Sequence, residues 1–122
     1  MIGYITLGTN DFAKATDFYE KLFAEIGAKR VMANDRMALW GTGVGAPMFG
    51  VCKPYDGKPA SHGNGTMIAL NVGSREAVQK VYAKALELGG SDEGEPGERG
   101  TGFYGGYFRD LDGNKLVAFV MG

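Results

Sequence analysis

The chain has 122 residues and a formal net charge of −1 at pH 7, which is the size of one ordinary domain. Hydrophobic residues make up 44% and charged residues 22%, a composition typical of a chain that buries its own core. Basic residues are scattered among acidic ones, so we expect no nucleic-acid partner. No stretch is apolar and long enough to span a membrane or direct export, so we expect a cytoplasmic protein without a membrane partner.

Cysteine and histidine each occur once, as Cys52 and His62. A single cysteine excludes an intramolecular disulfide and leaves a thiolate zinc site without a second sulfur. A nucleophilic pair of Cys52 with His62 has no residue to orient the base, so we expect Cys52 to be a buried, inert residue at a strand end. The chain also contains 21 glycines, which favours many short strands joined by tight turns.

An internal repeat organises the chain. The segment that starts at Tyr4 (YITLGTNDFAKATDFYEKLFAEIGA) aligns with the one that starts at Met67 (MIALNVGSREAVQKVYAKALELGGS). Tyr19 then matches Tyr82, and both copies have a glycine at the same place near their ends. Each copy predicts a strand, a helix cap, an amphipathic helix and a glycine that ends the helix.

The first copy begins with an alternating strand in which Ile5 and Leu7 share one face. A helix capped by Asn10 or Asp11 follows, with apolar residues at helical spacing: Phe12, Ala15, Tyr19, Leu22 and Ile26. Beyond Gly27 the pattern predicts three short strands, with a turn at Asn34-Asp35: Lys29–Ala33, Met37–Gly41 and Pro47–Cys52.

A polar stretch rich in Pro and Gly, residues 53–65, separates the copies and is predicted to be a linker. In the second copy Ile68 and Leu70 share a strand face, Ser74 caps a helix, and Gly89-Gly90 ends it. The apolar face of that helix has Val78, Val81, Tyr82, Ala85 and Leu88. Three strands follow, the last two joined by a hairpin at Asp112-Gly113: Ser91–Glu95, Tyr104–Arg109 and Lys115–Met121.

This order predicts an α+β fold in a single domain, 1–122, made of two βαβββ modules, 1–52 and 66–122. One helix per three or four strands places the helices on one face of curved antiparallel sheets. We expect the opposite faces to line a concave cleft, where small molecules tend to bind.

Two local motifs favour turns over cofactor sites. Residues 100–105 read G-x-G-x-x-G, but a strand follows them where dinucleotide binding requires a helix. We expect instead a mobile flap whose Phe103 and Tyr104 close on a ligand. The stretch from Asp110 to Asn114 is similar to the start of a calcium loop, yet the glycine and glutamate that such a loop needs further on are absent.

The two βαβββ halves resemble the vicinal oxygen chelate superfamily, which includes glyoxalase I, bleomycin and fosfomycin resistance proteins and extradiol dioxygenases. The opening YITLGTNDFAKATDFYEKLF is similar to the first strand and helix of that superfamily, and the closing YFRDLDGNKLVAF, with its Asp-Gly-Asn turn, is the most specific part of the resemblance. The resemblance covers essentially the whole chain.

The resemblance also implies where a metal site would lie. Metal-dependent members have a His on the first strand of each half, a Glu after the Asp-Gly-Asn turn and a further ligand on the last strand of the first half. These positions fall on Tyr4, Met67, Val117 and near Phe49. None of these side chains is a ligand for a divalent cation, so we expect no metal and no other cofactor.

The residues expected to line the cleft are largely aromatic or apolar, which suits a flat or apolar ligand. Asn71 and Arg109 are the polar groups expected to orient that ligand, although structural hydrogen bonding explains them equally well. The expected lining is Tyr4, Trp40, Phe49, Met67, Asn71, Tyr104, Tyr107, Arg109, Val117 and Phe119.

Three functions remain open at this point. The first is a metal-independent protein that sequesters a small molecule, as drug-resistance members of the superfamily do. The second is a lyase or isomerase similar to glyoxalase I, with unusual metal ligands or none, whose catalytic residues the sequence does not identify. The third is a structural or regulatory dimer. A homodimer is expected by analogy, because such chains usually pair two copies to complete their clefts.

Overall fold

The computed structural model describes residues 1–122 and has the expected order of elements, βαβββ twice. The first module contains β1 (Tyr4–Gly8), α1 (Phe12–Ala24), β2 (Lys29–Ala33), β3 (Met37–Gly41) and β4 (Met48–Cys52). The second contains β5 (Ile68–Asn71), α2 (Arg75–Glu87), β6 (Ser91–Glu98), β7 (Phe103–Arg109) and β8 (Lys115–Met121). The α+β prediction of two βαβββ modules is confirmed.

Each module forms a four-stranded sheet, in the orders β1-β4-β3-β2 and β5-β8-β7-β6. The expectation of antiparallel sheets is wrong for one pairing in each sheet, because β1 runs parallel to β4 and β5 runs parallel to β8. The physical reason is the long connection: a helix and two strands lie between the paired strands, and such a crossover returns the chain in the same direction.

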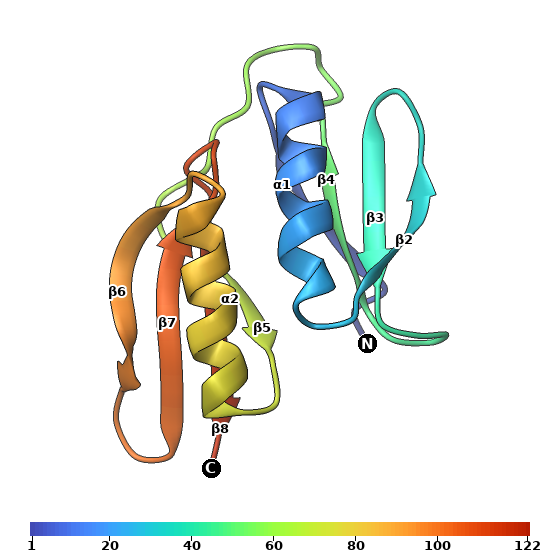
Figure 1. Cartoon of the computed structure of the whole chain (residues 1–122). Helices are drawn as coiled ribbons and strands as arrows, with labels where there is room; N and C mark the ends of the chain where they lie inside the picture. The colour runs from blue at the N-terminus through green and yellow to red at the C-terminus, as the bar shows by residue number, and fades with distance from the viewer.

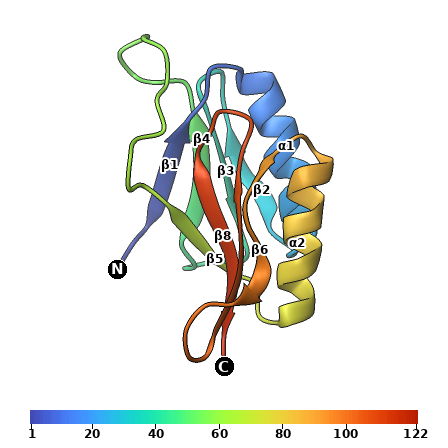
Figure 2. The same ribbon diagram turned by 90° about the vertical axis from the view of Figure 1, so that its left-hand side faces the viewer.

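Both helices lie on the same side of the two sheets (Figures 1 and 2). Their first turns are capped as predicted, because the Asp11 carboxylate accepts from the Lys14 amide at 3.1 Å and the Ser74 hydroxyl accepts from the Ala77 amide at 3.0 Å. Gly27 and Gly89 follow the helices with φ angles of 72° and 103°, which are left-handed values that favour glycine. Neither helix has the length and apolar character needed to cross a bilayer.

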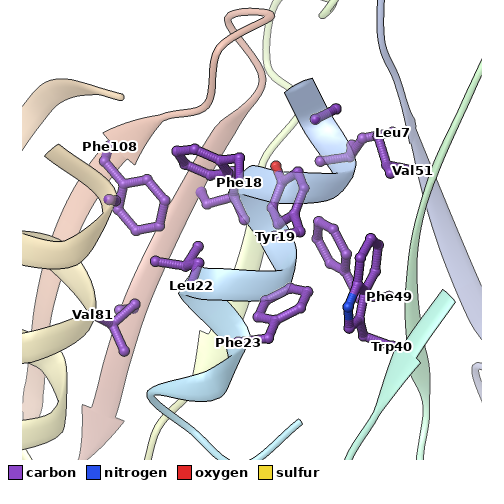
Figure 3. Close-up of a cluster of buried hydrophobic side chains, with 14 of the residues drawn as sticks. Leu7, Phe18, Tyr19, Leu22, Phe23, Trp40, Phe49, Val51, Val81 and Phe108 are labelled. Carbon is purple, nitrogen blue, oxygen red and sulfur yellow. The ribbon is translucent and has the colours of Figure 1, made fainter. Parts of the chain in front are cut away.

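One hydrophobic core spans both modules, and α1 lies at its centre. Figure 3 shows Phe18 and Leu22 on one side of α1, directed at Phe108 of β7 and Val81 of α2. On the other side Tyr19 and Phe23 pack against Phe49, with ring centroids 4.8 and 4.9 Å away. Large buried aromatic rings contribute strongly to core stability, and here they belong to a core that the two modules share.

Polar contacts join the modules at one end. The Tyr19 hydroxyl donates to the Asp110 carboxylate at 2.5 Å, and the Asn114 side-chain amide donates to the Gly8 carbonyl at 3.0 Å. The Asn10 side chain exchanges two hydrogen bonds with the main chain of Ala60, in the connection between the modules. The stretch Arg109–Asn114 therefore connects the second module to the first through hydrogen bonds.

Candidate functional site

A cavity of about 540 Å³ lies between the two modules. The first module contributes apolar side chains from β1, β3, β4, the last turn of α1 and the turn that follows α1: Ile5, Phe23, Ile26, Trp40, Met48 and Phe49. The second module contributes the consecutive residues Met67–Asn71, which include all of β5. The volume of this cavity is in the range of pockets that hold small molecules.

The chemistry of the cavity wall is almost entirely apolar. Apart from the indole N–H of Trp40, only Thr42 and Asn71 contribute polar side-chain groups to the lining, and no lining residue is titratable. The side-chain oxygen Oδ1 of Asn71 already accepts a hydrogen bond from the Gly73 amide at 3.2 Å. A wall of this kind recognises an uncharged molecule by burial of apolar area and offers no side chain for general acid–base chemistry.

The titratable groups with shifted pKa values lie outside the cavity. Burial, and then the nearby Asp110 carboxylate, raise the pKa of Tyr19 well above its ordinary value. Desolvation and a hydrogen bond to Asp92 raise the pKa of Tyr82 to about 12, and the same hydrogen bond lowers the pKa of Asp92. Perturbed pKa values often mark active sites, but here they mark structural contacts of the two helices.

Four of the ten residues expected to bind a ligand line this cavity: Trp40, Phe49, Met67 and Asn71. The expectation that Trp40 and Phe49 lie on the face opposite the helices is wrong. They are 1% and 7% exposed and pack beneath α1. The Trp40 indole N–H donates to the Glu20 carboxylate at 2.8 Å, which satisfies its one polar group.

Tyr104 does not line the cavity, contrary to the expectation. It lies on the helix side of β7, where the Gln79 amide donates to its hydroxyl at 2.9 Å and the Arg75 guanidinium lies 4.7 Å from its ring centroid. The predicted flap is likewise wrong for Phe103 and Tyr104, because both belong to β7. Successive strand residues point to opposite faces, so the two rings cannot close together on one ligand.

The remaining expected residues lie on the open face of the sheets, the face without helices. Val117 is fully buried there, and Phe119 stacks on Phe103 with centroids 5.1 Å apart. Tyr107 lies on the same face, because it is paired with Val117 in the β7–β8 ladder. Tyr4 is 55% exposed on β1, whose neighbour Ile5 faces the core. None of these four expected residues lines the cavity.

Three further residues singled out in the sequence, Arg109, Cys52 and His62, also lie away from the cavity wall. Arg109, expected to orient a ligand, hydrogen-bonds the Glu93 carboxylate and donates to the Gly113 carbonyl at 2.8 Å. Cys52 ends β4 as predicted but is half-buried, and His62 lies exposed in the connection. Neither Cys52 nor His62 lines the cavity.

Sequence reasoning missed several lining residues, among them Ile2, Thr42 and Met48. Met48 could have been predicted from the sequence, because its neighbour Phe49 was named as a lining residue. A strand beside a cavity can contribute residues from both of its faces. Ile2 and Thr42 lie outside any strand and have no signal in the pattern.

Comparisons with known proteins agree with this architecture. The model of the glyoxalase/bleomycin resistance protein/dioxygenase superfamily matches residues 1–118. The chain belongs to this superfamily. A crystal structure of a glyoxalase/bleomycin resistance protein from Albidiferax ferrireducens is 32% identical, with a TM-score of 0.91 and coverage of 100% of this chain and 99% of that one.

Other solved structures are more distant. A hypothetical protein from S. aureus is 26% identical, with a TM-score of 0.76 and coverage of 98% of this chain and 92% of that one. A lactoylglutathione lyase from Agrobacterium tumefaciens is 19% identical, with a TM-score of 0.72 and coverage of 98% and 92%, which shows a shared fold alone. No curated protein matches the chain.

The residues at the superfamily's metal positions do not fit a divalent metal. Tyr4, Met67 and Val117 offer no imidazole or carboxylate, and Phe49 directs its ring into the core. The residues beside it on β4, Met48 and Gly50, offer no ligand either. Nowhere do three His, Cys, Asp or Glu side chains gather as a metal site would require. The absence of a metal stays a prediction that metal analysis tests.

Proposed function

We propose that this superfamily member binds a small, uncharged, predominantly apolar molecule in the cavity between its modules and does so without a metal ion. The observation that carries the proposal is the cavity wall, which combines a volume of about 540 Å³ with the absence of any titratable lining residue. An apolar molecule that leaves water for such a wall gains roughly 25 cal/mol per Å² of buried apolar surface. An ionic ligand would lose its hydration without a compensating charge.

A neutral dye, Nile red, tests this proposal directly. We expect it to raise the melting temperature, because a ligand that prefers the folded state stabilises that state. We also expect it to quench Trp40, the single tryptophan and a residue of the cavity wall. Ala69→Phe, which adds a ring at the cavity wall, is expected to weaken binding at least tenfold.

Ala33→Phe is the matched control, because Ala33 is exposed on β2 and does not line the cavity. Its affinity for Nile red equals that of the unmodified protein. Equal affinity of all three proteins, or no binding by any of them, would contradict the proposal.

A lyase or isomerase of the glyoxalase I type is the alternative that the resemblance implies. No observation on this chain favours it, because the cavity has no acid, base or metal ligand. Turnover of a hemithioacetal of glutathione and a keto-aldehyde, dependent on an added divalent metal, is the result that would support it.

We also propose a homodimer that pairs the open faces of two copies. Large apolar side chains are exposed on or beside those faces, including Ile2 at 53%, Tyr4 at 55% and Met67 at 41%. Their burial against a second copy would remove them from water. Sedimentation equilibrium measures the stoichiometry, and Tyr4→Lys is expected to shift the population toward monomer.

A further inference from the structure

The few polar side-chain groups of the cavity wall limit the kinds of molecule that the cavity can bind. Trp40, Thr42 and Asn71 are the lining residues that carry such groups. The Trp40 side chain is buried and its indole N–H donates to the Glu20 carboxylate at 2.8 Å, so this donor is already used within the protein. Side-chain hydrogen bonds to a ligand in the cavity can therefore come only from Thr42 and Asn71.

Asn71 ends β5, and a local turn fixes which end of its side-chain amide is occupied. The side-chain oxygen Oδ1 accepts from the Gly73 amide, which is the hydrogen bond of an Asx turn between β5 and the Ser74 cap of α2. A main-chain amide can only donate, so the side-chain atom that faces it must be the oxygen. The turn therefore assigns the positions of Oδ1 and Nδ2 in this side chain.

The Nδ2 group of Asn71 is not needed by this turn. The single hydrogen bond that the side chain makes within the protein is the one to Gly73, and Asn71 is exposed, so the N–H groups of Nδ2 are available to a bound molecule. An aspartate would form the same turn, but it would place a negative charge beside an apolar wall. Asparagine instead adds an uncharged donor to a wall without titratable side chains.

The Asn71 donor restricts the ligand more than Thr42 does. A hydroxyl group both donates and accepts, so Thr42 is compatible with ligands of either kind. The Nδ2 group of Asn71 can only donate. A ligand that covers it without an acceptor leaves this group without its water partner, which costs free energy.

We propose that the molecule bound in this cavity has a carbonyl group on its apolar body, and that Nδ2 of Asn71 donates to the carbonyl oxygen. This inference rests on the proposed function and names the class of ligand for the same cavity: an uncharged ketone, ester or amide. The apolar wall buries the body of such a molecule, and Asn71 replaces the water that its oxygen loses on binding. Asn71 is thus a specificity-determining residue of the cavity.

The test compares two ligands of nearly the same shape. Benzophenone has a carbonyl group between two rings, and in diphenylethylene a methylene group replaces the carbonyl oxygen. Displacement of Nile red measures the affinity of each. The ratio of the two affinities is then compared between the unmodified protein and its variants, because contacts that both ligands share cancel in this comparison.

Two substitutions of Asn71 remove the donor. We expect Asn71→Leu and Asn71→Asp each to lower the ratio of benzophenone affinity to diphenylethylene affinity about fivefold, the usual effect of one hydrogen bond. Asn71→Asp separates this role from the turn, because its carboxylate still accepts from the Gly73 amide. Thr42→Val is the matched control, since it removes the other available polar side-chain group of the wall and is expected to leave the ratio unchanged.

The inference and the proposed function fail in different ways. An unchanged ratio in either Asn71 variant, a lower ratio in Thr42→Val, or failure of benzophenone to displace bound Nile red overturns the carbonyl inference while the proposed function stands. A protein that does not bind Nile red overturns the proposed function itself.

Discussion

The phenol oxygen of Tyr19 lies 2.5 Å from the carboxylate of Asp110 and joins the first helix to the last hairpin of the chain, 91 residues further on. Both residues are buried. The Asn114 side chain and two main-chain amides complete the hydrogen bonding of the carboxylate. This contact is central to the hydrogen-bond network that connects the two modules.

Removal of the Tyr19 hydroxyl tests how much this hydrogen-bond network contributes to stability. We expect Tyr19→Phe to lower the free energy of unfolding by about 1–3 kcal/mol, the usual cost when a buried charged group loses a partner. Urea denaturation measures the change. Tyr82→Phe is the matched control, because Tyr82 holds the equivalent place in the repeat but bonds the exposed Asp92. Equal effects of the two substitutions would show that the buried contact has no special role.

Stability is expected to fall in alkaline solution. Folding raises the pKa of Tyr19, so the folded chain holds this proton more tightly than the unfolded chain does. The resulting stabilisation is complete below the ordinary tyrosine pKa of about 10 and is lost as the pH rises above it. Urea denaturation between about pH 8 and pH 11 measures the slope, which is shallower in Tyr19→Phe. A Tyr19→Phe protein with an unchanged slope would refute the assignment to Tyr19.

Substitution of Gly113 tests how closely the connection between the modules packs against the last hairpin. Its φ is +85°, and a Cβ there would lie 2.8 Å from Cδ2 of His62. Gly45 has a φ of +81° with open space around it. Both alanine variants incur the left-handed backbone cost of about 1–2 kcal/mol, but Gly113→Ala also displaces His62 and is expected to be the less stable. The melting temperatures compare them, and His62→Ala is expected to remove the difference.

Removal of divalent metal is expected to change nothing. The positions at which the superfamily holds metal have Tyr4, Met67 and Val117, which are not ligands. Protein dialysed against a chelator therefore keeps its melting temperature and its affinity for Nile red. Elemental analysis of untreated protein is the direct measurement. A stoichiometric zinc, nickel or manganese ion, with a lower melting temperature after chelation, would contradict the proposal.

The sequence alone determined the secondary structure and the fold class. Helical spacing, the caps at Asp11 and Ser74 and the glycine exits are local signals, because each depends on neighbouring residues in the chain. The repeat then organised these elements into two βαβββ modules, and the superfamily followed from their order. The lack of imidazole and carboxylate side chains at the positions Tyr4, Met67 and Val117 was also visible in the sequence, since it requires only residue identity.

The tertiary structure decided which faces are buried and where a cavity forms. β3 illustrates the reason: Met37–Gly41 has four consecutive apolar residues, so alternation cannot tell whether Trp40 faces the helix or the open side. The same ambiguity misplaced Phe49 and Tyr104. The cavity is lined by residues of β1, β3, β4 and β5 together, and only the packing of the two modules brings these strands to one place. Long-range packing of this kind has no local pattern in the chain.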